Sequence, residues 1–134
     1  MIEIVKTSEL SGRGGAFFPT WIKWEGCRKE KATPKYVVCN ADEGEPGTFK
    51  DRVLLSKEPG SVLEGMIIAG YATGAKYGII YLRAEYMWLL KKLEATIQEF
   101  YDQKLLGRSI LGIPDLDFDV RIQVGAGSYV CGEE

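Results

Sequence analysis

Acidic and amide side chains gather directly after the first apolar run of the chain. Asn40, Asp42, Glu43 and Glu45 follow the run 36–39, Tyr-Val-Val-Cys, in a turn rich in glycine and proline. Their oxygens can accept hydrogen bonds from ribose or ribityl hydroxyls, and carboxylates can also bind Mg²⁺ or Ca²⁺. The spacing of a Ca²⁺-binding loop is absent. Two interpretations stay open, a hydroxyl-binding site and a solvated acidic turn.

A glycine-rich segment near the N-terminus, Gly12-Arg-Gly-Gly-Ala-Phe-Phe-Pro-Thr-Trp21, suits a phosphate and an aromatic ring. Backbone N–H groups freed by glycine can surround a phosphate, Arg13 adds a fixed positive charge, and Phe18 can stack on a ring. The segment departs from the dinucleotide fingerprint, because Phe17 takes its last glycine position and because it precedes the first predicted strand. A tight structural turn is the alternative.

The segment 125–134, Gly-Ala-Gly-Ser-Tyr-Val-Cys-Gly-Glu-Glu, again combines glycine with polar groups. Tyr129 offers an aromatic hydroxyl beside permissive glycine backbone, and Glu133 and Glu134 add two carboxylates. These groups could contact a ligand. Ordinary packing of Tyr129 is the alternative.

Alternating apolar runs and helical patterns must position these groups. Strands are predicted over 36–39, 77–82 and 118–124, and helices over 49–56, 61–72 and 86–104. Strands separated by helices form a parallel sheet, and its ligands bind beyond the carboxyl ends of the strands. Each of the three strands is followed by charged or glycine-rich residues: the acidic turn follows the first, Arg83 and Glu85 follow the second, and the segment 125–134 follows the third. The sequence therefore predicts an α/β, three-layer Rossmann-like domain with a mostly parallel sheet, preceded by the glycine-rich segment.

Local patterns predict how these elements begin and which faces they bury. Ser61 is the predicted N-cap of the helix 61–72, with Glu64 completing a capping box. This helix is apolar nearly all round, which predicts that it is buried. Six residues of the helix 86–104 share one face: Leu89, Leu90, Leu93, Ile97, Phe100 and Tyr101. The strand 118–124 alternates, which predicts one wetter face. Residues 1–11 are interpreted as a short lead-in, and 12–34 show little periodicity.

Composition and charge argue against several classes of function. The chain has 134 residues and a net charge of −2, so neither nucleic-acid binding nor direct membrane contact is expected. The N-terminus is unlike a signal peptide and the apolar runs are short, which predicts a cytoplasmic location. Three widely spaced cysteines and the absence of histidine argue against a disulfide framework, against a zinc or self-contained iron–sulfur site, and against Ser-His or Cys-His nucleophiles.

Four segments in a fixed order resemble the flavoprotein subunit of respiratory complex I. They are Gly12-Arg-Gly-Gly-Ala-Phe-Phe-Pro-Thr-Trp-Ile-Lys-Trp24, Tyr36-Val-Val-Cys-Asn-Ala-Asp-Glu-Gly-Glu-Pro-Gly-Thr-Phe-Lys-Asp-Arg52, Ile80-Tyr-Leu-Arg-Ala-Glu-Tyr86 and the segment 125–134. The same family includes the diaphorase subunits of NAD-reducing hydrogenases and the β subunits of NAD-dependent formate dehydrogenases. The resemblance covers nearly the whole chain, and four ordered motifs are very specific.

The resemblance implies that the chain binds FMN and NAD(H) and takes part in hydride transfer from NADH to FMN. It assigns FMN contacts to Gly12, Arg13, Gly14, Lys23, Asn40, Asp42, Glu43, Tyr129, Gly132 and Glu133. It assigns NAD contacts to Gly15, Ala16, Phe18, Glu45 and Glu134. No side chain is expected to be catalytic, because the flavin carries the reaction. The acidic turn favours NAD over NADP, because it discourages a second phosphate.

The resemblance also implies partners. Electrons would leave FMN singly for iron–sulfur subunits, namely a thioredoxin-like two-iron subunit and a large iron–sulfur subunit. Residues 1–134 would be part of an FMN/NAD-binding domain, without the family's ubiquitin-like segment and four-cysteine domain. A four-iron four-sulfur cluster is therefore expected only in a full-length subunit. The location would be cytoplasmic, at the periphery of a membrane complex for relatives of complex I.

Two departures from the family pattern keep an alternative open. Phe17 and Trp21 replace two family glycines. If those positions require positive φ or close approach of a ligand, the bulky side chains would close the pocket. The chain would then be a degenerate, non-catalytic nucleotide-binding or scaffold module of the same family.

Overall fold

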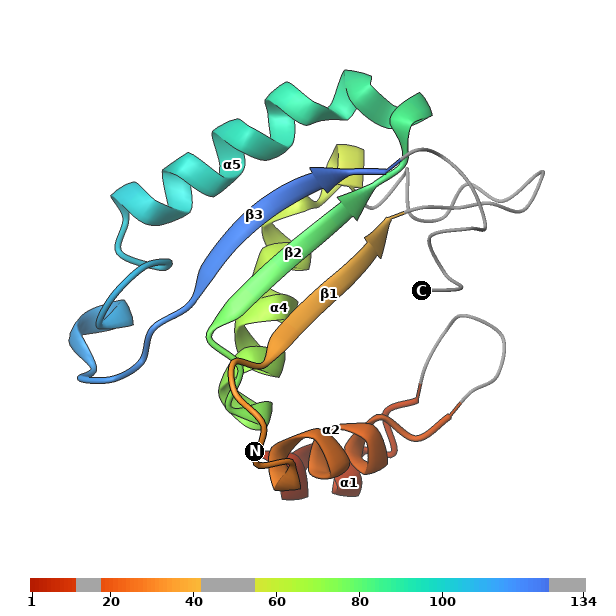
Figure 1. The fold of residues 1–134 in the computed structure, drawn as a ribbon, viewed down its shortest axis with the longest axis vertical. Helices are drawn as coiled ribbons and strands as arrows, with labels where there is room; N and C mark the ends of the chain where they lie inside the picture. The colour runs from red at the N-terminus through yellow and green to blue at the C-terminus, as the bar shows by residue number, and fades with distance from the viewer. Residues whose placement is uncertain (12–17, 42–54, 126–134) are drawn as a thin grey trace.

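The computed structural model describes residues 1–11, 18–41 and 55–125, and the structural statements below concern these residues (Figure 1). The predicted helix 49–56 lies mainly outside them, although residues 55–57 are helical. The predicted acidic turn, the glycine-rich segment before Phe18 and the segment after Gly125 also lie outside them.

A parallel sheet forms the centre of the fold. Its strands are β1 (Tyr36–Ala41), β2 (Tyr77–Leu82) and β3 (Asp119–Val124), hydrogen-bonded in the order β1-β2-β3. Both pairs are parallel, and Tyr36, Tyr77 and Asp119 stand in one row at the start of the sheet. The predicted parallel α/β arrangement is confirmed.

The strand ends differ slightly from the prediction. β1 runs two residues further than predicted, because Asn40 and Ala41 pair with Tyr81 and Leu82. β3 begins after Phe118, which instead forms an isolated antiparallel bridge with Gly107.

Helices cover one face of the sheet. α4 (Pro59–Thr73) precedes β2, and a 3₁₀ helix η1 (Ala84–Leu89) followed by α5 (Leu90–Asp102) connects β2 to β3 (Figure 1). A further 3₁₀ helix, η2 (Ile110–Gly112), lies in the connection to β3. The two α-helices and the sheet share one core of buried side chains: Leu63, Met66, Ile80, Leu82, Leu89, Leu93, Ile97, Phe100, Phe118 and Val120.

The opposite face of the sheet is not covered by the described residues. Tyr36 and Val38 on β1 are 52% and 59% exposed, and Tyr77 on β2 is 41% exposed. Two of the three predicted layers are therefore present in the described part of the chain. The third layer stays a prediction.

The start of α4 corrects one prediction. The N-cap is Glu58, with Pro59 at the first helical position, so the helix begins before Ser61. Proline favours this position because its missing N–H would have no partner there. Ser61 therefore lies inside the first turn, where its hydroxyl meets the Glu58 carboxylate at 3.4 Å. The predicted capping box is wrong.

The predicted burial of this helix holds only on one side. Leu63, Met66 and Gly70 are buried, but Ile68 is 44% exposed and Tyr71 is 58% exposed. An apolar helix can leave one face uncovered when only one neighbouring layer is present.

The second long helix is shorter than predicted and starts differently. Residues 84–89 form the 3₁₀ helix, and Tyr86, with φ −101° and ψ 22°, interrupts helical geometry there. α5 then ends at Asp102, and Lys104 has a positive φ of 63°. The predicted apolar face is confirmed, since its six residues are buried or pack against the core. The predicted wetter face of β3 is confirmed by exposed Arg121 and Gln123.

Two N-terminal helices were not predicted. α1 (Ile2–Ser8) lies within the expected lead-in, and α2 (Thr20–Lys29) lies within the segment of little periodicity. No residue of either helix is buried in the described part of the chain. Without a buried face there is no apolar periodicity to detect. α1 and α2 lie together outside the α/β core (Figure 1).

Candidate functional site

The carboxyl ends of the three strands lie at one edge of the sheet. Ala41, Leu82 and Val124 stand in the last row. The pairing continues one step further, because the Arg83 N–H donates to the Ala41 oxygen at 3.3 Å and the Gly125 N–H donates to the Leu82 oxygen at 2.9 Å. The residues that directly precede the acidic turn and the segment 125–134 therefore lie at the same edge of the sheet, on either side of β2, as predicted.

Asn40 lies one row before this edge, on the sheet face that α4 and α5 do not cover. It is exposed and stands beside Tyr81 of β2, whose neighbour on β3 is Gln123. The Asn40 side chain can both donate and accept hydrogen bonds. Its position at the end of the uncovered face suits contact with a ligand that binds beyond the strand ends.

Tyr81 is a candidate that the sequence interpretation missed. It is half-buried in the same row as Asn40, and a Cβ atom on Gly125 would overlap its ring. Gly125 thus lets the phenol ring lie against the start of the segment 125–134. The alternation of Tyr77, Ile79 and Tyr81 on one strand face is the signal that could have revealed it.

Phe18 and Lys23 form a second part of the site at the start of α2. The Lys23 ammonium lies 5.1 Å from the centre of the Phe18 ring, a cation–π distance. Phe18 is 43% exposed, so part of its side chain is accessible to another group. Lys23 is exposed and carries a positive charge that suits a phosphate. The pair combines the two features expected for a nucleotide.

Trp21 occupies the position of its family glycine without backbone strain. It lies in the first turn of α2, and it is not among the residues with positive φ. The Lys6 ammonium of α1 lies 4.7 Å from the Trp21 ring. Residues two apart on a helix differ by about 200° in direction, so Trp21 and Lys23 leave α2 on opposite sides. Trp21 therefore joins α1 to α2 on the side away from Lys23.

The remaining predicted site residues lie outside the described residues, as does Phe17. They are Gly12, Arg13, Gly14, Gly15, Ala16, Asp42, Glu43, Glu45, Tyr129, Gly132, Glu133 and Glu134. Their assignments stay predictions. Phe18, Lys23 and Asn40 are the described members of the set.

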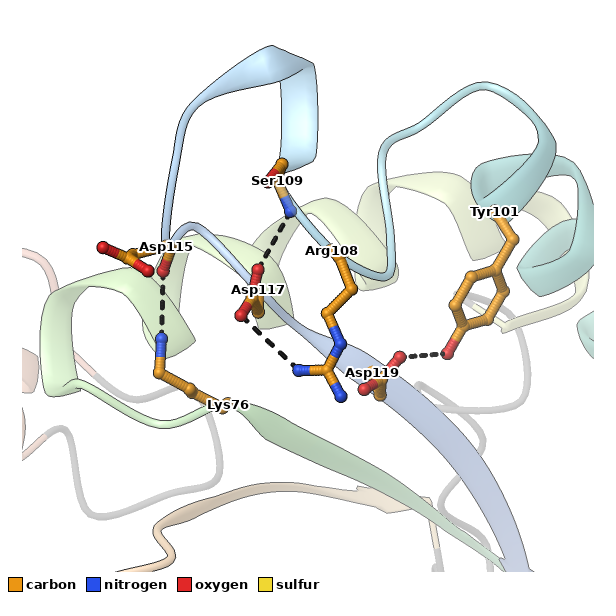
Figure 2. Close-up of polar contacts among 7 residues, drawn as sticks. All are labelled: Lys76, Tyr101, Arg108, Ser109, Asp115, Asp117 and Asp119. Atoms are coloured by element: carbon orange, nitrogen blue, oxygen red, sulfur yellow. Dashed lines mark hydrogen bonds and ion pairs between the residues drawn. The ribbon is translucent and has the colours of Figure 1, made fainter.

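Two groups with shifted pKa values lie at the opposite, amino-terminal end of the strands (Figure 2). The Ser109 N–H donates to Asp117 Oδ1 at 2.9 Å, and this bond is the main reason why the pKa of Asp117 is lowered. Burial is the main reason why the pKa of Tyr101 is raised, and its hydroxyl lies 3.1 Å from Asp119 Oδ1. The Val120 N–H also donates to this hydroxyl, at 3.2 Å. These contacts hold the connection to β3 in place, so they are structural.

Further features of the described residues limit the choice of site. A groove of about 720 Å³ lies between α5 and the outer edge of β3, and Phe18, Lys23 and Asn40 do not line it. Within residues 1–11, 18–41 and 55–125, no three His, Cys, Asp or Glu residues gather in a way that could hold a metal ion. In the same residues, none of the helices has the length and apolar character needed to cross a bilayer.

Comparison with known proteins places the chain in a protein family. The profile of a protein family described as the Nuo51 FMN-binding domain matches residues 5–134. The chain belongs to this family. The match confirms the resemblance that the four ordered segments indicated.

Individual relatives agree with the family. The chain is 56% identical over its whole length to NAD-reducing hydrogenase HoxS subunit alpha of Cupriavidus necator, of which it covers 22%. It is 47% identical over its whole length to an NADH-quinone oxidoreductase subunit of Rhizobium meliloti, of which it covers 32%. A crystal structure of NAD⁺-reducing nickel–iron hydrogenase in the H₂-reduced state matches 99% of this chain and 22% of that chain, with a TM-score of 0.82 and 46% identity. This chain thus spans about a fifth to a third of the length of these proteins.

Proposed function

We propose that this chain is the FMN- and NADH-binding part of an NADH-oxidising flavoprotein subunit. The observation that carries the proposal is the alignment of the strand ends. Asn40 and the residues that precede the acidic turn and the segment 125–134 lie at one edge of the sheet, in a chain of the Nuo51 FMN-binding domain family. In this proposal residues 1–134 form part of a longer FMN/NAD-binding domain.

The described residues fit the two cofactors chemically. Lys23 supplies a cation for the FMN phosphate, and Asn40 supplies an amide that can pair with polar edges of the flavin or with ribityl hydroxyls. Phe18, which is 43% exposed, stacks on the dinucleotide. Gly12, Arg13, Gly14, Asp42, Glu43, Tyr129, Gly132 and Glu133 complete the proposed FMN contacts, and Gly15, Ala16, Glu45 and Glu134 complete the NAD contacts.

FMN, when bound, accepts a hydride from the nicotinamide and releases the electrons one at a time. This chain's own residues bind and orient the two cofactors, and none of them needs to act as an acid or base. The proposed reaction therefore agrees with a chain that has no histidine.

The partners of the proposed reaction are iron–sulfur subunits. Two similar proteins are named as subunits of NAD-reducing hydrogenase and of NADH-quinone oxidoreductase. By analogy, we expect this chain to deliver electrons to a thioredoxin-like two-iron subunit and a large iron–sulfur subunit. We also expect a cytoplasmic location, peripheral to a membrane if the assembly is of the complex I type.

Titration of flavin fluorescence tests the proposal. The polypeptide that contains residues 1–134 is expected to bind FMN and, once loaded, to reduce ferricyanide with NADH. Loss of FMN fluorescence on binding gives the affinity, and riboflavin without the phosphate is the matched control because Lys23 would lose its partner. Failure of the intact polypeptide to bind FMN would end the proposal.

The degenerate-module alternative is tested by restoring the two family glycines. Trp21→Gly is expected to give no gain in NADH-dependent ferricyanide reduction, because Trp21 leaves α2 away from Lys23. Phe17→Gly is the informative variant, since Phe17 lies outside the described residues. A large gain of activity in Phe17→Gly over an inactive parent would support the alternative in which Phe17 blocks the pocket.

A further inference from the structure

Helix α2 carries the predicted cofactor contact Lys23, and Pro19 separates its first residue from Phe18, yet little apolar burial holds the helix in place. None of its residues is buried within the described part of the chain, although it packs against both α1 and α4. α4, in contrast, is anchored in the core by Leu63 and Met66. Polar contacts must therefore contribute to fixing α2 relative to the sheet.

Two cations join the carboxyl end of α2 to the carboxyl end of α4. Arg28 Nη1 donates to the Ala72 oxygen at 2.9 Å and to the Tyr71 oxygen at 3.5 Å. Lys35 Nζ donates to the Thr73 oxygen at 3.2 Å and to the Arg28 oxygen at 3.0 Å. Lys35 directly precedes β1, so the same contacts also tie the start of the sheet to both helix ends.

These contacts complete the hydrogen bonding at the end of α4. The last four carbonyl oxygens of an α-helix have no partner within the helix. In α4 the Gly70 oxygen accepts the Gly74 N–H at 2.9 Å, Arg28 reaches the next two oxygens, and Lys35 reaches that of Thr73. Each of the four oxygens therefore has a donor, and two of the three donor residues, Arg28 and Lys35, are distant from α4 in the chain.

Electrostatics make the two cations necessary where these helices meet. The carboxyl end of a helix carries a partial negative charge of about half an elementary charge. Here two such ends come together, and they would repel one another without positive charge between them. Hydrogen bonds from charged donors to carbonyl oxygens are also stronger than neutral ones.

We propose that Arg28 and Lys35 are positioning residues that set α2, and with it Phe18 and Lys23, at the correct place relative to β1 and Asn40. We call this pair with its carbonyl partners the α2–α4 clamp. Its effect on cofactor binding rests on the proposed function, whereas its effect on α2 does not. Phe18 and Lys23 both precede Arg28 in the chain, so their contact with each other does not depend on the α2–α4 clamp.

Hydrogen exchange measured by mass spectrometry on the full polypeptide tests the mechanical part. Arg28→Gln and Lys35→Met are expected to lower the protection of the α2 amides by about tenfold, because each leaves carbonyl oxygens without a donor. Protection of β2 and α5 is expected to stay unchanged. Lys76→Met is the matched control, because it also removes a lysine bond to a main-chain oxygen, that of Asp115 at 3.0 Å, but at the connection to β3.

FMN affinity in the same variants tests the positioning of the site. Arg28→Gln and Lys35→Met are expected to raise the FMN dissociation constant by about tenfold, and Arg28→Lys and Lys35→Arg are expected to recover most of the loss. A purely structural role would speed exchange in α2 and leave the FMN dissociation constant unchanged.

Each outcome separates the two proposals. Unchanged α2 protection in both variants would overturn the clamp, and so would an equal loss of protection in β2 and α5. Faster α2 exchange with unchanged FMN affinity would overturn its role at the site. If the variants show faster α2 exchange but the parent polypeptide never binds FMN, the mechanical clamp stands and the proposed function is overturned.

Discussion

Lys23 is the described residue whose charge is most directly suited to a cofactor phosphate. It is exposed, it lies beside the Phe18 ring, and its helix position turns it away from Trp21. The neighbouring Lys29, in contrast, is paired with Glu25 at 3.0 Å on the same helix. The two lysines therefore offer a matched comparison of site charge and surface charge.

Lys23→Gln is expected to weaken FMN binding by about tenfold or more, because a hydrogen bond to a charged group contributes roughly 1.5–3 kcal/mol. Flavin fluorescence titration measures the change. Lys29→Gln should leave the affinity unchanged, since an exposed ion pair contributes little. Equal affinity in Lys23→Gln and the parent would remove Lys23 from the site.

At the scale of elements, Phe118 determines how α4 meets β2. Its ring is 2% exposed and lies against Gly70 of α4 and Gly78 of β2. A Cβ atom on Gly70 would come within 2.6 Å of the ring, and one on Gly78 within 2.8 Å. Both glycines weaken their own elements, but they leave the space that the ring occupies.

Two glycines of α4 are expected to respond to alanine with opposite signs. Gly65→Ala should stabilise the fold by about 0.5–1 kcal/mol, because alanine favours the helix and nothing lies within 4 Å of the new Cβ. Gly70→Ala should destabilise it by about 1–3 kcal/mol, because the methyl group overlaps Phe118. Urea unfolding measures both, and a stabilising Gly70→Ala would contradict the packing described here.

The connection between α5 and β3 depends on a carboxylate as well as on packing. Asp117 accepts the Ser109 N–H and lies 3.5 Å from Arg108 (Figure 2). Its pKa is lowered from 3.8, first by the Ser109 N–H and further by the positive charges of Lys76 and Arg108. The ionised form therefore stabilises the fold above the unfolded-state value, and this contribution is lost as the pH falls through the lower folded-state pKa.

Asp117→Asn is expected to lower the urea midpoint at neutral pH, and the gap to the parent should close as the pH falls below 3.8. Urea titrations over a series of pH values measure this gap. Asp115→Asn is the control, because Asp115 meets Lys76 through its main-chain oxygen. A gap that widens on acidification would contradict the assigned direction.

At the scale of the whole molecule, the sheet has one covered and one uncovered face among the described residues. Val37 packs against the core, whereas Val38, the next residue, is 59% exposed. Tyr36 and Tyr77 lie on the same face as Val38, with ring centres 5.7 Å apart. Asn40 stands at the carboxyl end of this face.

The two neighbouring valines are expected to differ in their tolerance of a hydroxyl group. Val37→Thr should cost about 1–3 kcal/mol, because it places a polar group against the core. Val38→Thr should cost less than about 0.5 kcal/mol, because the side chain stays in water and threonine suits a strand. Thermal or urea unfolding compares them, and equal large losses would indicate that the second face is covered.

The sequence by itself determined the class of the fold and the family. Local sequence is enough to recognise the apolar runs of β1, β2 and β3 and the one-sided apolar pattern of α5. Strands and helices repeat about every 2 and 3.6 residues, and these periods reflect local backbone geometry. The four ordered motifs identify the family without any structure, and they predict that Phe18, Lys23 and Asn40 contact the cofactors.

Only the tertiary structure decided how these parts meet. α1 and α2 bury no residue, so their sequences carry no periodic signal, and their place depends on contacts with distant residues such as those between Arg28 and the end of α4. Packing between elements determines that Trp21 lies toward α1, away from Lys23, and that Tyr81 lies against Gly125. Such contacts join residues far apart in the chain, and a local pattern cannot encode them.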